Sequence, residues 1–283
     1  MKNQKKSFVS RARMLRCALF TFVFAGCVAQ SQAAITFPFT LVGTSGTLDA
    51  NLNLGSGTLN NWQVGGQNQL VNQWFYYNVG SPGPASSIDS MSSLGSVSTN
   101  FSGAPPKVKG TYTQTGLVQI TPTFVLNGNT LSDTIQVKNV SGATQTIYFY
   151  QYSDFDLGNA PGSQTVNMFP ISGTQAEVDQ SGGGVTLQTL LQPVSGGTML
   201  MQADNGGALF GPMNGSGTSL DNTTLSASGN AVFAIEWYAT LANNASFTIS
   251  ENQIITVPEP TTLALISSGI LALGWLHRRR RVG

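Results

Sequence analysis

Short runs of β-branched and aromatic residues, separated by turn-forming residues, dominate the chain between residues 34 and 256. In "TIYFYQY" (146–152), Ile147 and Phe149 would face one side of a strand, and Tyr148, Tyr150 and Tyr152 the other. Lysine and glutamate are rare here, whereas Gly, Ser, Thr and Asn are common, which disfavours long helices. Short strands at close intervals predict one all-β domain, an antiparallel β-sandwich of jelly-roll or immunoglobulin-like character.

Two β-hairpins are predicted most clearly. In the first, a strand containing Ile135 and Val137 returns as a strand over 144–152, after the turn "NVSGA" in which Gly142 can adopt a positive φ. In the second, a strand over 232–240 turns at "LANNA" and returns through Phe247 and Ile249. Further strands are expected at 36–41, 48–54, 74–79, 116–126, 185–191, 198–203 and 219–226, with "SGGGV" (181–185) as a turn.

The charges of the chain are separated by position. The formal net charge of the whole chain is +1, but the region 34–257 holds eight Asp and three Glu against Lys107, Lys109 and Lys138, and therefore carries −8. This region has no arginine. Nucleic-acid binding needs clustered Lys and Arg, so no nucleic-acid partner is expected. Docking of this region on an anionic membrane surface is disfavoured for the same reason.

The first 33 residues have the layout of a secretory signal peptide. A basic stretch, "MKNQKKSFVSRARMLR", precedes the apolar "CALFTFVFAGCVA" and the small residues of "QSQAA". We expect a signal helix over 1–33 that signal peptidase removes by cutting between Ala33 and Ala34. The alternative is that "FAGC" resembles a lipoprotein box, in which case the cut would precede Cys27 and lipid would be attached there.

The last 27 residues predict a membrane anchor. Pro258 and Pro260 should end the folded domain. The apolar run 261–276 would form a helix of about 24 Å, short for a hydrocarbon core of about 30 Å. Trp275 at the interface and snorkelling arginines make a thin transmembrane helix feasible. Within the tail 277–283, we expect Arg278, Arg279, Arg280 and Arg281 to stay in the cytoplasm as an anchor.

This terminal region resembles the PEP-CTERM sorting signal of Gram-negative bacteria. It has Pro258-Glu259-Pro260 within a motif at 257–260, then an apolar helix, then an arginine cluster. The resemblance implies recognition at Pro258, Glu259 and Pro260 by an exosortase, a membrane cysteine protease-transpeptidase, and release or re-attachment at the surface. Relatives often belong to organisms that make exopolysaccharide and form biofilms. The alternative is an ordinary anchor that is never cut.

Two stretches of the body resemble parts of uncharacterised PEP-CTERM ectodomains, a resemblance that implies no activity. They are "YSDFDLG" (152–158) and "FAIEWYATLANNASFTIS" (233–250).

Residues 34–256 contain no His, Cys or Arg. Ser-His-Asp and Cys-His catalysis are therefore excluded there, as are His-ligated metal sites. Carboxylates remain: Asp154 and Asp156 lie two apart after a strand, and Glu177 and Asp179 repeat this spacing. Each pair fits a structural turn, Ca²⁺ ligands or a glycosidase pair. We expect no catalytic residue and no cofactor, with Asp154 and Asp156 as candidates for binding Ca²⁺.

Aromatic residues are the other candidates for binding. Trp62, Trp74, Phe75, Tyr76 and Tyr77 cluster early, and Trp237 and Tyr238 lie in a late strand. Most should fill the core of the sandwich. If "WFYY" (74–77) is a strand, two of its four rings must face outward, where they could stack on sugar rings.

The expected protein is a non-enzymatic surface or matrix protein associated with exopolysaccharide and biofilm. Its precursor would be anchored in the inner membrane with the domain in the periplasm, and the protein would then reach the cell surface or the extracellular space. A carbohydrate-binding module is the first alternative, and a carboxylate-based glycoside hydrolase is the second. Glycan binding by the region 34–257 would separate the first two.

Overall fold

The structure is a computed structural model that describes residues 39–42, 46–101, 105–170, 175–206, 209, 213 and 219–258. These residues belong to one compact unit. Several predicted features lie outside the described residues. At the N-terminus these are the signal helix and its cleavage site, Ala33 and Ala34. At the C-terminus they are Glu259, Pro260, the transmembrane helix and the arginine cluster. Within the described ranges, no helix combines the length and apolar character needed to cross a membrane.

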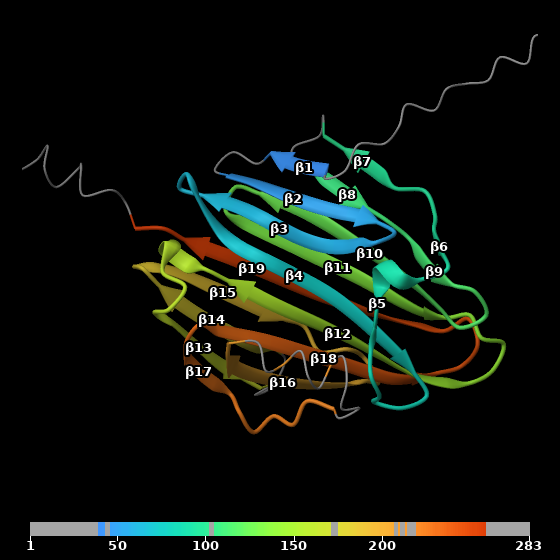
Figure 1. The fold of residues 1–283 in the computed structure, drawn as a ribbon. Helices are drawn as coiled ribbons and strands as arrows, with labels where there is room; N and C mark the ends of the chain where they lie inside the picture. The colour runs from blue at the N-terminus through green and yellow to red at the C-terminus, as the bar shows by residue number, and fades with distance from the viewer. Residues whose placement is uncertain are drawn as a thin grey trace, which may run out of the picture. The chain divides into compact units, whose positions relative to one another are not determined.

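Two antiparallel sheets contain the strands of the described residues (Figure 1). The eight-stranded sheet has the order β1-β2-β3-β4-β12-β18-β16, with β5 paired to β4. Its strands are β1 (Phe39–Val42), β2 (Gly46–Asn53), β3 (Ser56–Val64), β4 (Gln67–Val79), β5 (Ser86–Ser87), β12 (Gln145–Phe155), β16 (Thr198–Asn205) and β18 (Ala231–Leu241).

The eleven-stranded sheet has the order β17-β13-β14-β15-β19-β11-β10-β8-β7, and β9 pairs with β10 and β6. Its strands are β6 (Ser93–Leu94), β7 (Ser98–Asn100), β8 (Lys107–Lys109), β9 (Tyr112–Gln114), β10 (Val118–Asn127), β11 (Thr130–Asn139), β13 (Gln164–Phe169), β14 (Ala176–Gly182), β15 (Val185–Leu191), β17 (Ser226–Gly229) and β19 (Ser246–Thr256). Two 3₁₀ turns, η1 (Ile88–Ser90) and η2 (Leu157–Asn159), lie between strands.

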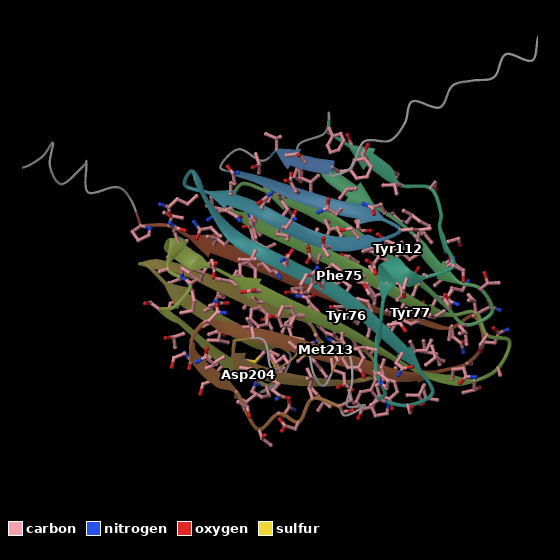
Figure 2. The ribbon with its side chains drawn as sticks, viewed as in Figure 1. Phe75, Tyr76, Tyr77, Tyr112, Asp204 and Met213 are labelled. Carbon is pink, nitrogen blue, oxygen red and sulfur yellow. The ribbon has the colours of Figure 1, made fainter. Side chains whose placement is uncertain are left out.

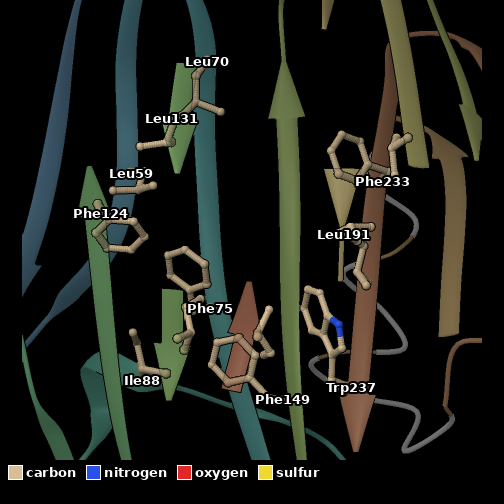
Figure 3. Close-up of a cluster of buried hydrophobic side chains, with 14 of the residues drawn as sticks. Leu59, Leu70, Phe75, Ile88, Phe124, Leu131, Phe149, Leu191, Phe233 and Trp237 are labelled. Carbon is tan, nitrogen blue, oxygen red and sulfur yellow. The ribbon is translucent and has the colours of Figure 1, made fainter. Parts of the chain in front are cut away.

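The core lies between the two sheets, because alternate residues of each strand face inward (Figure 3). Along β10 every second residue from Val118 to Leu126 is buried. Rings from the two sheets meet: Phe75 of β4 stacks on Phe124 of β10 with centroids 5.7 Å apart, and on Phe149 of β12 at 6.1 Å. Each such fully buried side chain contributes roughly 1.5–3 kcal/mol of hydrophobic stabilisation.

The predicted antiparallel sandwich is confirmed, and its described sheets carry more strands than the roughly eight of a jelly roll or an immunoglobulin-like domain. The strand predicted at 185–191 coincides with β15. The strand predicted at 219–226 is wrong, because β17 begins only at Ser226. The Oδ1 of Asp221 accepts a hydrogen bond from the N–H of Thr223 at 2.8 Å, and Asn222 has a φ of 57°. These local turns take the place of the backbone hydrogen bonds that a strand would form with its neighbours.

The two predicted hairpins have the predicted turns but the wrong strand partners. Gly142 has a φ of 84°, as expected for the first turn. However, β11 pairs with β10 and β19, whereas β12 pairs with β4 and β18. The chain therefore passes from one sheet to the other at both connections, β11–β12 and β18–β19. Each of these four strands buries one face. The buried faces of β11 and β12, and likewise of β18 and β19, therefore face each other across the core, and the strands are not neighbours in one sheet.

Asn139 joins these two connections. Its Nδ2 donates to the carbonyl oxygens of Ala143 at 2.7 Å, in the β11–β12 connection, and of Leu241 at 2.8 Å, at the end of β18. Its Oδ1 accepts from the N–H of Ser141 at 2.9 Å, and its side chain is fully buried. A single asparagine thus satisfies three backbone groups where strands change sheets.

The segment "YSDFDLG" (152–158) is the place where β12 ends and η2 packs on the β14–β15 turn. Phe155 is fully buried, and its ring stacks on Phe233 at 6.1 Å. Gly158 has a φ of 63° and lies against the backbone of Gly183, whose φ is 54°. The "SGGGV" stretch is the predicted turn, since β14 ends at Gly182 and β15 begins at Val185.

Candidate functional site

The outer face of the eight-stranded sheet carries aromatic side chains on three adjacent strands, β4, β12 and β18. Cross-strand pairing fixes their arrangement, because directly opposite residues share a face. The rows across these strands, with their neighbours on β16 where paired, are Asn78–Tyr148–Tyr238–Thr198, Tyr76–Tyr150–Glu236–Leu200 and Trp74–Tyr152–Ala234–Gln202. We call these residues the aromatic face.

The stretch "WFYY" divides between the two sides of β4, as expected. Phe75 and Tyr77 belong to the core between the sheets, whereas Trp74 and Tyr76 belong to a separate cluster on the outer face. Figure 2 labels Phe75, Tyr76 and Tyr77 along β4. Trp62 and Trp237 are fully buried in the core, and Tyr238 faces outward. The expectation that most of these rings fill the core and that two rings of "WFYY" point outward is confirmed.

Part of the aromatic face is covered. Leu209, Met213 and Leu220, which follow β16 in the chain and which we call the covering residues, pack against Tyr76, Tyr150 and Tyr152. The carbonyl of Met213 accepts a hydrogen bond of 2.6 Å from the N–H of Ala85.

Trp74, Tyr148 and Tyr238 stay half-buried, and two ring pairs define this accessible part. Tyr148 stacks on Tyr238 with centroids 5.1 Å apart, and Trp74 stacks on Tyr152 at 5.8 Å. The aromatic face therefore keeps flat ring surfaces within reach of solvent.

One residue of the aromatic face, Glu236 on β18, carries a buried carboxyl group. Glu236 is fully buried, and burial raises its pKa. Its Oε2 accepts a hydrogen bond of 2.8 Å from the N–H of Leu220, which opposes that rise. Burial, followed by the nearby Glu236, also raises the pKa of Tyr148 and Tyr150. Glu236 therefore holds the covering residue Leu220 in place.

The Ca²⁺ candidates Asp154 and Asp156 lie where β12 leads into η2. Asp154 is on the outer face opposite Asn72. Burial, with the charge of Asp156 as a second cause, raises the pKa of Asp154 to about 6. Burial also raises the pKa of Asp156, whose carbonyl accepts the N–H of Asn159 in the turn. Among the described residues, no group of three or more His, Cys, Asp or Glu comes together, so Ca²⁺ binding here stays a prediction.

Glu177 and Asp179 lie on the outer face of the other sheet. Asp179 lines a groove of about 450 Å³ formed by β13, β14, β15 and β19. Its lining includes Asn167, Ser181, Thr186, Gln188 and Ile254. The Oε1 of Glu177 accepts a hydrogen bond from Gln188. Burial and then the charge of Glu177 raise the pKa of Asp179. The lining contains no aromatic ring, so this groove lacks the stacking surface of the aromatic face.

One polar cluster was not anticipated from the sequence. Seven polar side chains lie buried between the sheets: Gln73, Asp133, Gln151, Ser153, Thr189, Glu251 and Gln253. The available signal was polar residues at inward positions of alternating strands, such as Gln151 between Phe149 and Phe155. Such a residue is indistinguishable from a solvent-facing one until the sheet that covers it is known.

The C-terminal strand leads directly into a recognisable motif. β19 ends at Thr256, and Pro258 follows as the last described residue. The family model described as the PEP-CTERM protein-sorting motif matches residues 256–281. The chain carries a PEP-CTERM sorting motif. Its motif implies export, processing at the membrane, and an exosortase as the processing enzyme, as the terminal sequence predicted.

Comparison of this chain with solved structures supports the sandwich. A bacterial glucoamylase complexed with acarbose matches at a TM-score of 0.51 and 13% identity, over 79% of this chain and 34% of the glucoamylase. The chain thus spans about a third of that enzyme, and the likeness shows the fold alone.

Two further matches have lower TM-scores. A putative aldose 1-epimerase from Escherichia coli K12 matches at 0.43 and 9% identity, over 78% of this chain and 99% of that one. A galactose mutarotase related enzyme from Lactobacillus acidophilus matches at 0.46 and 8% identity, over 78% and 98%. No curated protein sequence matches the chain.

Proposed function

We propose that this protein is a non-catalytic surface or matrix protein that binds exopolysaccharide through its aromatic face. Before processing, the predicted helix 261–276 anchors the precursor in the inner membrane with the sandwich in the periplasm. An exosortase then removes the anchor, and the domain reaches the cell surface or the extracellular space. Signal peptidase and exosortase are its processing partners.

The stacked pair of Tyr148 and Tyr238 carries this proposal. Both rings are half-buried on the outer face, with centroids 5.1 Å apart. Trp74 lies two rows further along the same face, opposite Tyr152. Because Tyr148 and Tyr152 are four residues apart on one strand, the rows are separated by roughly 13 Å. Rigid rings at this spacing offer an elongated apolar surface with polar edges, which suits a chain of sugar rings.

The carboxylates near this face support binding more than catalysis. A glycosidase needs two carboxyl groups on either side of one bond. Glu236 is fully buried and engaged with the backbone of Leu220. Asp154 lies at the end of β12, beyond the rows of rings. Residues 34–256 have no His or Cys to supply another catalytic group.

Binding can be measured with polysaccharide extracted from the producing organism's own culture. We expect the purified chain to be retarded in an affinity gel containing this polysaccharide. Tyr148→Ala/Tyr238→Ala should weaken binding at least about tenfold, which corresponds to about 1.4 kcal/mol. Phe169→Ala is the control, because Phe169 is 51% exposed on a strand of the other sheet. Both variants should keep the parent's unfolding temperature within a few degrees.

Two results would contradict the proposal. Unchanged retardation of Tyr148→Ala/Tyr238→Ala, with the fold intact, would place binding elsewhere. Release of reducing ends from the polysaccharide, abolished by Glu236→Gln, would instead support a carboxylate-based hydrolase.

A further inference from the structure

The polar cluster buried between the sheets, which we call the interior polar network, contains residues of both sheets. The eight-stranded sheet contributes Gln73, Gln151 and Ser153, and the eleven-stranded sheet contributes Asp133, Thr189, Glu251 and Gln253. Each of these side chains is at most 2% exposed. Asp133 and Glu251 are directly opposite on β11 and β19, and Thr189 and Gln253 are opposite on β15 and β19. Two carboxyl groups therefore lie side by side in the interior between the sheets.

Hydrogen bonds connect the network and fix its amide groups. The Nε2 of Gln253 donates to Glu251 Oε1 at 2.6 Å and to Gln73 Oε1 at 3.0 Å. The Nε2 of Gln73 donates to Asp133 Oδ2 at 3.2 Å. The Nε2 of Gln151 donates to Glu251 Oε1 at 3.1 Å. Because these nitrogens face acceptors, the oxygens of Gln151 and Gln253 must point elsewhere.

Five oxygen atoms of the network have no hydrogen-bond partner among the described residues. They are Asp133 Oδ1, Gln151 Oε1, Thr189 Oγ1, Glu251 Oε2 and Gln253 Oε1. Buried polar atoms are normally paired, and buried charges are normally neutralised. The lysines of the described residues, Lys107, Lys109 and Lys138, are not among the buried side chains. The two carboxyl groups, which supply two of these five oxygens, therefore have no lysine partner within the described part of the chain.

We propose that this network binds one Ca²⁺ ion through the unpaired oxygens of Asp133, Gln151, Thr189, Glu251 and Gln253. One divalent cation balances the two carboxylates, and every donor atom is an oxygen, the ligand type that hard cations prefer. Ca²⁺ accepts six to eight oxygens in flexible geometry, whereas Mg²⁺ retains several waters that a closed interior does not favour. The ion would tie β11, β15 and β19 of one sheet to β12 of the other.

Protonation is the competing way to neutralise the network. Burial raises the pKa of Asp133, with Glu251 as the second cause, and burial raises the pKa of Glu251 to about 7. The two accounts are compared at pH 8, above the pKa of Glu251, where protons compete less well with Ca²⁺ for this carboxyl group.

The test uses the full-length chain in detergent, freed of metal with EDTA and transferred to chelator-free buffer at pH 8. Calorimetric titration with CaCl₂ should give one Ca²⁺ per chain. At a Ca²⁺ concentration about 100-fold above Kd, Tm should rise by about 5–10 °C. The same concentration of MgCl₂ should leave Tm within about 1 °C of the metal-free value.

Substitutions locate the ion. Glu251→Gln and Asp133→Asn should each abolish the Ca²⁺ response. Asp221→Asn should retain it, because Asp221 is exposed and an asparagine can keep the bond to Thr223. If either core variant does not fold, the calorimetric titration of the parent chain still tests whether the protein binds Ca²⁺. No Ca²⁺ effect on the parent at pH 8 would overturn the proposal in favour of protonated carboxyls. Loss of the response in Asp154→Asn, with Glu251→Gln unaffected, would overturn it in favour of the Asp154–Asp156 pair.

Discussion

Gly158 and Gly183 lie backbone against backbone. A Cβ built on Gly158 would come within 2.7 Å of the Cα of Gly183, and one built on Gly183 within 2.6 Å of the carbonyl oxygen of Gly158. Both residues also have positive φ values, 63° and 54°. This contact packs η2 against the β14–β15 turn, next to the buried Phe155.

Gly158→Ala should destabilise the protein by roughly 2–5 kcal/mol, from about 1–2 kcal/mol of backbone strain and about 1–3 kcal/mol of steric overlap. Gly142→Ala is the control, because Gly142 has a φ of 84° and a Cβ added to it would meet nothing within 4 Å. Gly142→Ala should therefore lose only the stability that corresponds to backbone strain, about 1–2 kcal/mol. Urea unfolding measures both, and equal losses in the two variants would disprove the role of the Gly183 contact.

Asn139→Ala should cost roughly 2–4 kcal/mol. The substitution removes the side-chain donor to the carbonyl of Leu241 and the acceptor of the Ser141 N–H, and each buried unpaired group costs about 1–3 kcal/mol. The carbonyl of Ala143 also loses a donor but keeps the hydroxyl of Ser141 at 3.0 Å. Asn243→Ala should cost less than about 1 kcal/mol, since Asn243 is exposed and accepts one bond, from Gly142. Urea unfolding of both variants provides the comparison. A loss for Asn139→Ala no larger than for Asn243→Ala would show that Asn139 does not hold the two sheet connections.

Asp154 should make the protein less stable as the pH rises. Its pKa in the folded protein is raised to about 6, from an ordinary value of 3.8, by burial and then by Asp156. The folded state therefore binds this proton more tightly, and stability falls between about pH 4 and pH 6. Asp154→Asn should consequently be modestly more stable than the parent at pH 7, and the gain should vanish below about pH 4.

Thermal unfolding in EDTA from pH 3.5 to 7.5 measures this difference. Asp221→Asn is the control of opposite sign, because hydrogen bonds from Thr223 lower the pKa of Asp221. Its contribution is present above the unfolded pKa and is lost as the pH falls, so Asp221→Asn should give no gain at pH 7. A gain for Asp154→Asn that persists at pH 3.5 would show that the carboxylate charge is not its cause.

Replacing Pro258-Glu259-Pro260 by three alanines should leave the protein in the membrane fraction, because the exosortase motif is lost while the apolar run 261–276 is kept. Replacing Thr261 and Thr262 by alanines is the neighbouring control and should allow normal processing. Cell fractionation and mass spectrometry of the mature C-terminus report the outcome. Unchanged release of the triple-alanine variant would indicate that this motif does not direct processing.

The aromatic face could be predicted in part from the sequence, whereas the interior polar network could not. Alternation placed Tyr148, Tyr150 and Tyr152 together on one side of β12, since side-chain direction in a strand depends only on position along it. That Tyr150 and Tyr152 are buried under Leu209, Met213 and Leu220 depends on contacts between distant segments. Asp133 and Glu251 are 118 residues apart and meet only because β11 and β19 are neighbours.

Local chemistry in the sequence alone determined the all-β class, the turns at Gly142 and "SGGGV", the acidic character of the region 34–257 and the PEP-CTERM motif. These follow from side-chain alternation, backbone freedom and charge, which neighbouring residues set. The tertiary structure alone decided that β11 and β12, and likewise β18 and β19, lie in different sheets. The same turn residues serve a hairpin or a crossing between sheets, and the choice rests on which apolar faces the completed core brings together.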